Sequence, residues 1–178
     1  MTIWTPRRPR CFGITRRREA MAGRLQRTGL RQSQMRAVAE RRYGDAKALI
    51  ATGHVERASG AIYLAGFTIE ILLKGRLLLR HPSLSAIPLN SPALTKNEAR
   101  LRDLIFRFHD LPGLLDALPE VQDAIKVAGH RAHKPYFEWL KSICSTWTVL
   151  ARYSSEQTTL QEAIVFIDRV KVLKELLK

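Results

Sequence analysis

Cysteine is nearly absent from this sequence: Cys11 and Cys144 are the only two in 178 residues. One belongs to an arginine-rich N-terminal segment and the other to a predicted helix, which gives neither a disulfide framework nor a zinc motif. His130 and His133 stand three residues apart, but no cysteine and no pair of carboxylates accompanies them close by in the sequence. We therefore expect a protein of a reducing cytoplasm that has no metal site and no cofactor.

Long apolar runs are also missing. The most apolar stretch, from Ala61 to Leu73, is interrupted by Thr68 and Glu70 and is shorter than the ~20 residues that cross a bilayer. Arginines interrupt residues 1 to 20, which have no apolar core of the kind found in secretory signals. We expect no membrane partner. An organelle presequence is also rich in arginine and poor in acids, so the composition leaves that alternative open.

Neither a strand pattern nor a glycine-rich phosphate loop is found in the sequence. The motifs Gly-x-x-x-x-Gly-Lys-Ser/Thr and Gly-x-Gly-x-x-Gly do not occur, so no nucleotide pocket is indicated. Apolar residues recur at helical spacing, and no segment alternates with a period of two. The sequence therefore predicts an all-α protein with one domain over residues 35–178.

The first half of the domain predicts two long helices. They cover about residues 32–51 and 55–80, with Gly53 ending the first and Pro82 ending the second. Residues 82–94 contain three prolines and three serines and are expected to form a loop. Gly60 and Gly66 lower helix propensity, so we expect them to mark places where helices cross closely.

The second half predicts shorter helices. Thr95-x-x-Glu98 and Thr159-x-x-Glu162 have the spacing of capping boxes, each opening a helix. A short helical piece follows His109, a helix over about 120–128 is expected to end at Gly129, and Pro135 suits the first turn of the next. That helix carries one apolar stripe, made of Tyr136, Leu140, Ile143, Trp147 and Leu150.

Glu70 is a charge in the middle of the most apolar helix. Lys74 follows it at the i,i+4 spacing, with the acid first, which favours an intrahelical ion pair. One interpretation places Glu70 at the edge of the buried stripe, paired with Lys74. The other buries Glu70 against a later helix, where it requires a basic partner because an unpaired buried charge is costly. We expect a structural or interface role for Glu70 in both.

The net charge of +14 is concentrated at the N-terminus. Residues 1–36 hold ten arginines, no lysine and one acid, a charge of +9, whereas the rest of the chain carries +5. Such an arm, over about residues 1–34, is expected to be disordered and to bind nucleic acid without sequence preference. An inert tail or a misplaced start codon remains the alternative. The arm residues assigned to nucleic-acid binding are Arg7, Arg8, Arg10, Arg16, Arg17 and Arg18.

Residues 39–78 resemble the opening helical pair of HEPN (higher eukaryotes and prokaryotes nucleotide-binding) domains. The matching residues are Tyr63, Leu64, Ala65, Gly66, Phe67, Glu70, Leu73 and Lys74. His109-Asp110-Leu111 resembles the family's His-Asp-Leu before a short helix, and Arg152-Tyr153 resembles the Arg-Tyr that closes its fourth helix.

The resemblance covers about residues 36–178 and implies an up-and-down bundle of four or five helices, often a homodimer. Members are frequently encoded beside a minimal nucleotidyltransferase, or act in defence and toxin–antitoxin systems. The resemblance places the domain start near Met35, which agrees with an appended arm. It also implies that a helix ending at Arg152 packs near Glu70, so Arg152 is the expected partner if Glu70 is buried. Glu70, Lys74, Arg152 and Tyr153 are the predicted structural or interface polar residues.

Some HEPN domains are metal-independent ribonucleases with an Arg-x4–6-His motif. This sequence offers Arg76-x4-His81 and Arg102-x6-His109. With so many arginines, chance alone predicts about two matches, so the motif carries no information here. No residue is therefore assigned as catalytic, although Arg76, His81, Arg102 and His109 are the ones to examine.

Three functions remain open at this point. The leading hypothesis is a non-catalytic helical interaction module, forming a homodimer or docking on a minimal nucleotidyltransferase. The second is a metal-independent ribonuclease toxin. The third is a nucleic-acid-binding module that acts through the arm.

Overall fold

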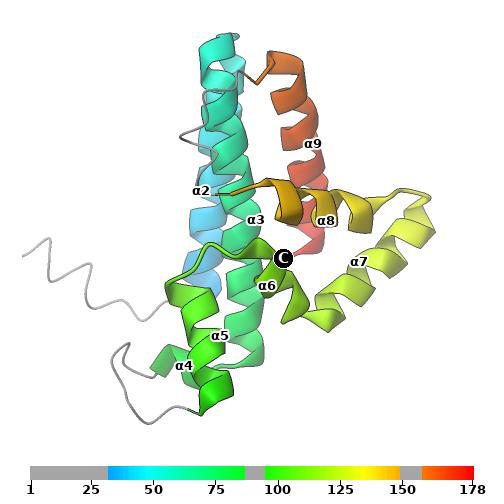
Figure 1. Ribbon diagram of the computed structural model, residues 1–178. Helices are drawn as coiled ribbons and strands as arrows, with labels where there is room; N and C mark the ends of the chain where they lie inside the picture. Colours follow the sequence, from blue (N-terminus) through cyan, green and yellow to red (C-terminus); the bar gives the residue numbers. More distant parts are fainter. Residues whose placement is uncertain (1–31, 87–94, 149–157) are drawn as a thin grey trace, which may run out of the picture.

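The computed structural model describes residues 32–86, 95–148 and 158–178, and these residues form helices and short connections without a β-strand. The predicted all-α class is confirmed. In Figure 1 the longer helices lie beside one another, with shorter helices gathered on one side. The arginines assigned to the N-terminal arm fall outside the described residues, so the expectation that they bind nucleic acid stays a prediction. Residues 32–34, at the expected end of the arm, are helical rather than disordered.

Helices α2 (Gln32–Ala51) and α3 (Ala58–Arg80) form an antiparallel pair, the longest in the described chain. Gly53 follows α2 with a φ of +70°, the left-handed conformation that glycine adopts at helix ends, as the sequence predicted. A single turn of 3₁₀ helix, Val55–Arg57, leads into α3. Both predicted long helices are therefore confirmed, with the second beginning as 3₁₀ rather than α.

Helix α9 (Leu160–Leu176) runs parallel to α3. Ser59 and Thr158 meet through their hydroxyls at 3.2 Å where the two helices begin, and Arg76 Nε donates to Leu177 O at 2.9 Å where they end. Thr159 and Glu162 form the predicted capping box at its start. Because α9 is the last helix of the chain, this alignment returns the C-terminus to the middle of the molecule (Figure 1).

Lys174 links α9 back to α2. Its side chain is only 7% exposed, and its ammonium donates to Glu40 at 2.7 Å and 2.8 Å. Hydrogen bonds from Lys174 and Lys178 lower the pKa of Glu40, and bonds from the same two lysines lower the pKa of Glu175 to about 2. Helices α2 and α9 are thus held together at this end by charge as well as by packing.

Shorter helices cover one side of this trio. After α3, α4 (Ser83–Ala86) forms a single turn where a loop was expected, which corrects that expectation for these four residues. Helix α5 (Lys96–Phe106) begins with the predicted Thr95–Glu98 capping box. Then α6 (Leu111–Asp116), α7 (Pro119–Ala132) and α8 (Tyr136–Thr146) follow. Figure 1 shows α8 lying across α3 and α9, while α7 runs outward to meet it in a projecting hairpin.

The predicted end of α7 at Gly129 is wrong, because the helix continues to Ala132 and closes with His133 in the left-handed conformation at φ 51°. Gly129 has a different physical role. A Cβ on Gly129 would lie 2.7 Å from the carbonyl oxygen of Lys134. Glycine at this position therefore lets the chain fold back closely over the last turn of α7. In the sequence, a glycine needed for space cannot be told apart from a glycine that ends a helix.

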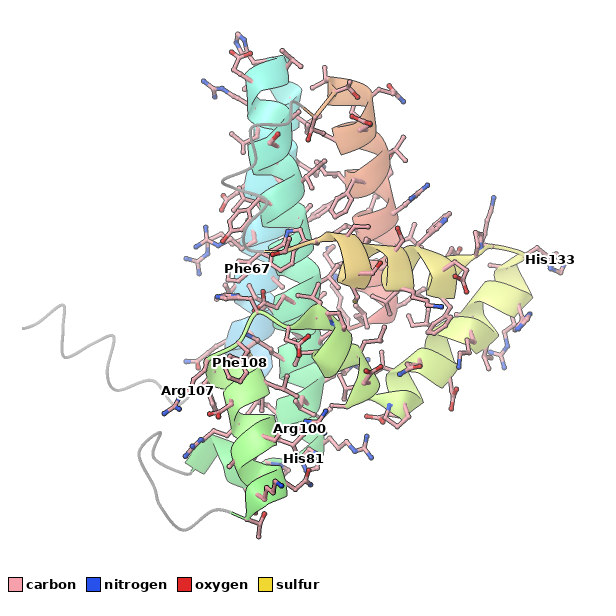
Figure 2. All side chains as sticks on the ribbon, in the orientation of Figure 1. Phe67, His81, Arg100, Arg107, Phe108 and His133 are labelled. Carbon is pink, nitrogen blue, oxygen red and sulfur yellow. The ribbon has the colours of Figure 1, made fainter. Side chains whose placement is uncertain are left out.

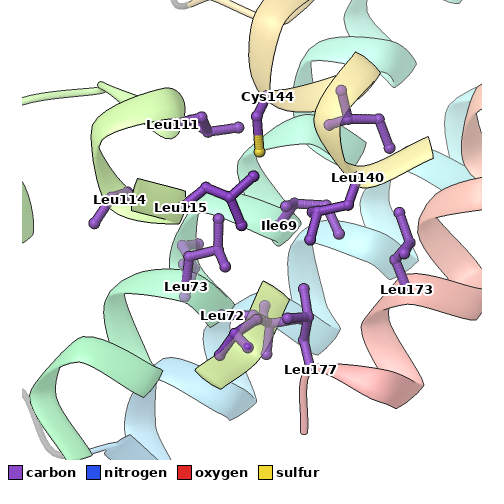
Figure 3. Close-up of a cluster of buried hydrophobic side chains, with 14 of the residues drawn as sticks. Ile69, Leu72, Leu73, Leu111, Leu114, Leu115, Leu140, Cys144, Leu173 and Leu177 are labelled. Atoms are coloured by element: carbon purple, nitrogen blue, oxygen red, sulfur yellow. The ribbon is translucent and has the colours of Figure 1, made fainter. Parts of the chain in front are cut away.

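The hydrophobic core lies where α3 meets α6, α8 and α9 (Figure 3). Ile69 and Leu73 of α3 are fully buried, as are Leu140 and Ile143 of the predicted apolar stripe on α8, which are 0% and 2% exposed. Cys144 lies in the same cluster at 3% exposure, and its burial raises the pKa of the thiol to about 12. Of the predicted stripe, Leu140 and Ile143 lie on the buried face of α8 and Tyr136 is half-buried. The helix ends at Thr146, so Trp147 is buried from an extended backbone rather than from a further helical turn, and Leu150 falls outside the described residues.

Trp147 packs directly on Gly66 of α3. The indole Nε1 donates to Tyr63 O at 3.1 Å, and a Cβ added to Gly66 would overlap the indole ring. Gly60, in contrast, makes only an ordinary contact, 3.6 Å from the added Cβ to Leu49. The expectation of a close approach is therefore right for Gly66, where a side chain approaches the helix, and wrong for Gly60.

These two glycines give a matched stability test. Gly66→Ala should lower the free energy of unfolding by about 1–3 kcal/mol, because the methyl group displaces Trp147 and breaks its hydrogen bond. Gly60→Ala, in the same helix, should raise stability by up to about 1 kcal/mol through helix propensity. Urea unfolding followed by circular dichroism measures both, and equal effects of the two substitutions would contradict the packing described.

Candidate functional site

Glu70 lies at the centre of the site and is completely buried, with 0% of the residue exposed. Its carboxylate forms an ion pair with Lys74 one turn further along α3, and both its oxygens lie 3.0 Å from His109 Nδ1. The predicted Glu70–Lys74 pair is confirmed, but the position at the edge of the stripe is wrong. We call Glu70, Lys74 and His109 the ion triad.

Lys74 joins the ion triad to the loop that follows α5. Besides its contact with Glu70, Lys74 Nζ donates to Phe108 O at 2.9 Å, and the residue is 8% exposed. In the same loop, Asp110 caps α6 by accepting a hydrogen bond from Gly113 N at 3.0 Å. In the His-Asp-Leu sequence, the His109 side chain therefore contacts α3, and the Asp110 side chain caps the start of α6.

His109 is held on one side and open on the other. Its side chain is 43% exposed, and its ring lies 6.0 Å from the ring of Phe67, between centroids. Since a carboxylate can only accept, the nitrogen facing Glu70 is the protonated one, and the neutral ring then carries its lone pair on Nε2. Among the described residues, no hydrogen-bond partner occupies Nε2.

Aromatic side chains lie beside the ion triad, which they meet where Phe67 faces His109. Tyr63 and Phe67 stack on each other at 6.2 Å between centroids, and Trp147 stacks on them at 5.8 Å and 6.4 Å. Tyr63 and Phe67 are partly exposed, and Phe108 is 53% exposed. Figure 2 shows Phe67 and Phe108 on the same side of the molecule. We call Tyr63, Phe67 and Phe108 the aromatic strip.

The two Arg-x-His matches do not form comparable pairs. Arg76 uses its Nε to hold Leu177 O, and His81 closes α3 through its backbone N–H; no contact joins the two side chains in the described structure. Arg102 is 8% exposed, with Nε 3.7 Å from Asp103 Oδ1, whereas His109 faces solvent. Of the four residues, only His109 combines an ordered ring with access from outside.

Other predicted site residues lie beyond the described part of the chain. Arg152 and Tyr153 belong to residues 149–157, so the predicted contact of Arg152 with Glu70 and the predicted interface role of Tyr153 stay predictions. His109 is the Glu70 partner that sequence reasoning missed. A signal was present, because a buried acid in the most apolar helix requires a basic group from elsewhere, and His109 is one of only five histidines in the sequence.

Among the residues that the structure describes, no three His, Cys, Asp or Glu side chains converge as metal ligands. None of the helices within 32–86, 95–148 and 158–178 has the length and apolar character to cross a membrane.

The chemistry open to the ion triad follows from its geometry. Glu70 fixes the orientation of the His109 ring, as a carboxylate does for a histidine base, which leaves Nε2 able to accept a proton from a bound molecule. The same contacts also serve packing, since they attach the loop over 107–110 to α3. The two roles of Glu70, orienting the His109 ring and anchoring the loop, can be separated by substitution.

Glu70→Gln should lower the free energy of unfolding by about 3 kcal/mol or more, because it leaves the Lys74 ammonium buried without a counter-charge. The double variant with Lys74→Met should lose less, since it removes both charges. Glu120→Gln, in an exposed ion pair with Arg80, serves as control and should cost less than about 1 kcal/mol. Chemical unfolding measures all three, and a Glu70→Gln effect as small as the control would contradict a buried triad.

Comparison of this chain with protein-family models, with curated proteins and with solved structures gives no match. The resemblance to HEPN domains therefore stays a hypothesis that rests on the residues quoted for it. The function of this chain is therefore inferred from those residues and from the geometry of the ion triad and the aromatic strip.

Proposed function

We propose that this chain is a non-catalytic helical interaction module of the HEPN type, with an up-and-down bundle of four or five helices at its centre. Its partner is a second copy of the chain or a minimal nucleotidyltransferase, as in a toxin–antitoxin or defence system. The proposal rests on one structural observation, the aromatic strip, together with the resemblance of α2 and α3 to the family's opening pair.

The aromatic strip has the composition of an interface centre. Interface cores are enriched in tyrosine, phenylalanine and arginine and depleted of lysine and acids, and a few aromatic residues contribute most of the binding energy. Phe108 leaves more than half of its surface in solvent, at 53% exposure, and the exposed Arg107 precedes it. Burying such a ring on a partner removes apolar area from water at about 25 cal/mol per Å².

The ion triad supports the strip as a rigid surface. Lys74 holds the backbone of Phe108, and Glu70 holds the neighbouring His109, so the loop is fixed before a partner arrives. Pre-organisation of this kind lowers the entropy cost of association. The charged residues on this face of α3 thus contribute to binding through the loop they position.

Phe108→Asp should weaken self-association by at least about 30-fold, the size expected from losing one central aromatic contact worth about 2 kcal/mol. The control is Leu79→Asp, which introduces the same charge at an apolar residue of equal exposure, 55% against 53%, outside the strip. Sedimentation equilibrium of the full chain measures the association constant. A monomeric wild type that also retains no co-expressed nucleotidyltransferase contradicts the proposal, as does equal weakening by both variants.

A metal-independent ribonuclease is the second candidate, and one observation favours it. His109 is oriented by a buried carboxylate and leaves Nε2 accessible, the arrangement that a general base requires. The exposed Arg107, two residues earlier, adds a cation for a phosphate. This candidate uses the same side of the molecule as the aromatic strip, so an assay must separate the two.

An RNA-cleavage assay makes that separation. The interaction module should show no cleavage by wild type above that of the His109→Ala variant. If wild type cleaves RNA, His109→Ala abolishes cleavage and His54→Ala does not, then the ribonuclease replaces the module as the function. His54 is a suitable control because it is an exposed histidine that, among the described residues, forms its ion pair with the nearby Glu56. The Phe108→Asp variant, which should weaken self-association, shows whether loss of the dimer alone changes the rate of RNA cleavage.

A further inference from the structure

Helices α2 and α9 leave an open hollow of about 230 Å³ between them, which the proposed function does not use. We call it the amphipathic hollow. None of its lining residues belongs to the ion triad or to the aromatic strip. The residues that the argument needs first are Tyr43, Lys47 and Ile50 of α2 and Ile164, Ile167 and Asp168 of α9.

Branched aliphatic side chains form the apolar part of the lining. Ile167 is 5% exposed, and Ile50 and Ile164 are half-buried. We call these three residues the isoleucine wall. If each non-hydrogen atom takes ~30 Å³, the share of liquid volume that one water occupies, the hollow accommodates about eight such atoms. It therefore suits a ligand smaller than a nucleotide or a typical drug, with an aliphatic group to place on the wall.

Tyr43 brings an unused hydroxyl to the hollow. The residue is only 9% exposed, and Lys174 Nζ lies 4.9 Å from the centre of its ring, so the ring is held in place. Among the described residues, no group forms a hydrogen bond with this hydroxyl. Burial raises the pKa of Tyr43, and the charge of Asp168 raises it further, so the hydroxyl stays protonated and can donate. A buried tyrosine hydroxyl usually has a partner, and here the partner can be a bound molecule.

Opposite charges line the hollow from its two helices. Lys47 of α2 and Asp168 of α9 both contribute to the lining, and within the described part of the chain neither forms an ion pair. Lys171 of α9 adds a second ammonium. Further along the same two helices, Lys174 contacts Glu40 directly at 2.7 Å. Helices α2 and α9 thus pair opposite charges where they meet, and leave opposite charges apart where the hollow lies.

We propose that the amphipathic hollow binds a free aliphatic α-amino acid of about the size of valine or leucine. The branched side chain packs on the isoleucine wall. The carboxylate accepts hydrogen bonds from the Tyr43 hydroxyl and the Lys47 ammonium, and the α-ammonium pairs with Asp168. A molecule with both charges satisfies groups of both helices, whereas an anion alone meets Asp168 and a cation alone meets two lysines.

Calorimetry of the full chain with leucine tests the class of ligand. Leucine should bind at least about tenfold more tightly than leucinamide, which lacks the carboxylate, and than 4-methylpentanoate, which lacks the ammonium, because each loses charge-assisted contacts. Alanine should also bind at least about tenfold more weakly, since it lacks the branched group that the isoleucine wall covers.

Substitutions with matched controls test the place of binding. Tyr43→Phe, which keeps the ring and removes the hydroxyl, should weaken leucine binding by at least about fivefold, and Asp168→Asn by at least about tenfold. The controls are Tyr136→Phe and Asp123→Asn, which make the same changes outside the hollow and should alter the dissociation constant less than about twofold.

A third pair of variants tests the shape of the site without removing a polar group. Ile164→Trp should fill the hollow and weaken leucine binding by at least about tenfold. Val165→Trp places the same side chain at the next residue of α9, which is 39% exposed and does not line the hollow, and should leave binding unchanged. Circular dichroism checks that both variants keep the helix content of the wild type.

Each outcome decides for or against the proposal. Losses confined to the variants within the hollow would support it. Equal losses in a variant and its control, or no binding of leucine or valine at millimolar concentration, would overturn it. Leucinamide that binds as tightly as leucine would point to the amino end of a peptide instead, and 4-methylpentanoate that does so would point to a simple carboxylic acid; both results would overturn the free amino acid as ligand.

Discussion

The buried carboxylate of Glu70 is the constraint on which the rest of this structure depends. A charge removed from water costs several kcal/mol unless ions and hydrogen bonds replace its hydration. Here Lys74 comes from the same helix, whereas His109 comes from a loop 39 residues away along the chain. The loop must therefore reach α3 for the helix to bury its own acid, and the start of α6 follows because Asp110 caps it.

This coupling explains why one face of α3 combines polar and aromatic residues. The ion triad fixes the loop over 107–110 beneath the surface. On the preceding turns of the same helix, Tyr63 and Phe67 stack with Trp147. The rigidity of this face thus comes from the buried charges of Glu70 and Lys74 beneath it. The hairpin of α7 and α8 has no such anchor, and its shape depends on Gly129 and on the backbone turn at His133.

The sequence predicts those parts of the fold that depend on local chemistry. Both capping boxes, the end of α2 at Gly53 and the pairing of Glu70 with Lys74 involve residues within four positions of each other, so spacing is sufficient. Gly129 shows the limit. Glycine serves there to admit a carbonyl from the following turn, and a helix stop and a close approach look identical in a sequence. His109 shows the same limit for the candidate site, because its contact with Glu70 depends on how two distant segments pack.

The burial of Cys144 allows opening of the protein core to be measured by thiol modification. Thiol reagents attack the thiolate, and a buried thiol whose pKa is about 12 is almost entirely protonated at neutral pH. Modification of Cys144 must then wait until α8 separates from α3 and α6, so its rate measures how often that opening occurs. In a chain with Cys11→Ser, the rate at which an alkylating reagent modifies Cys144 would thus report the rate at which α8 opens. No label or engineered residue has to be placed in the core.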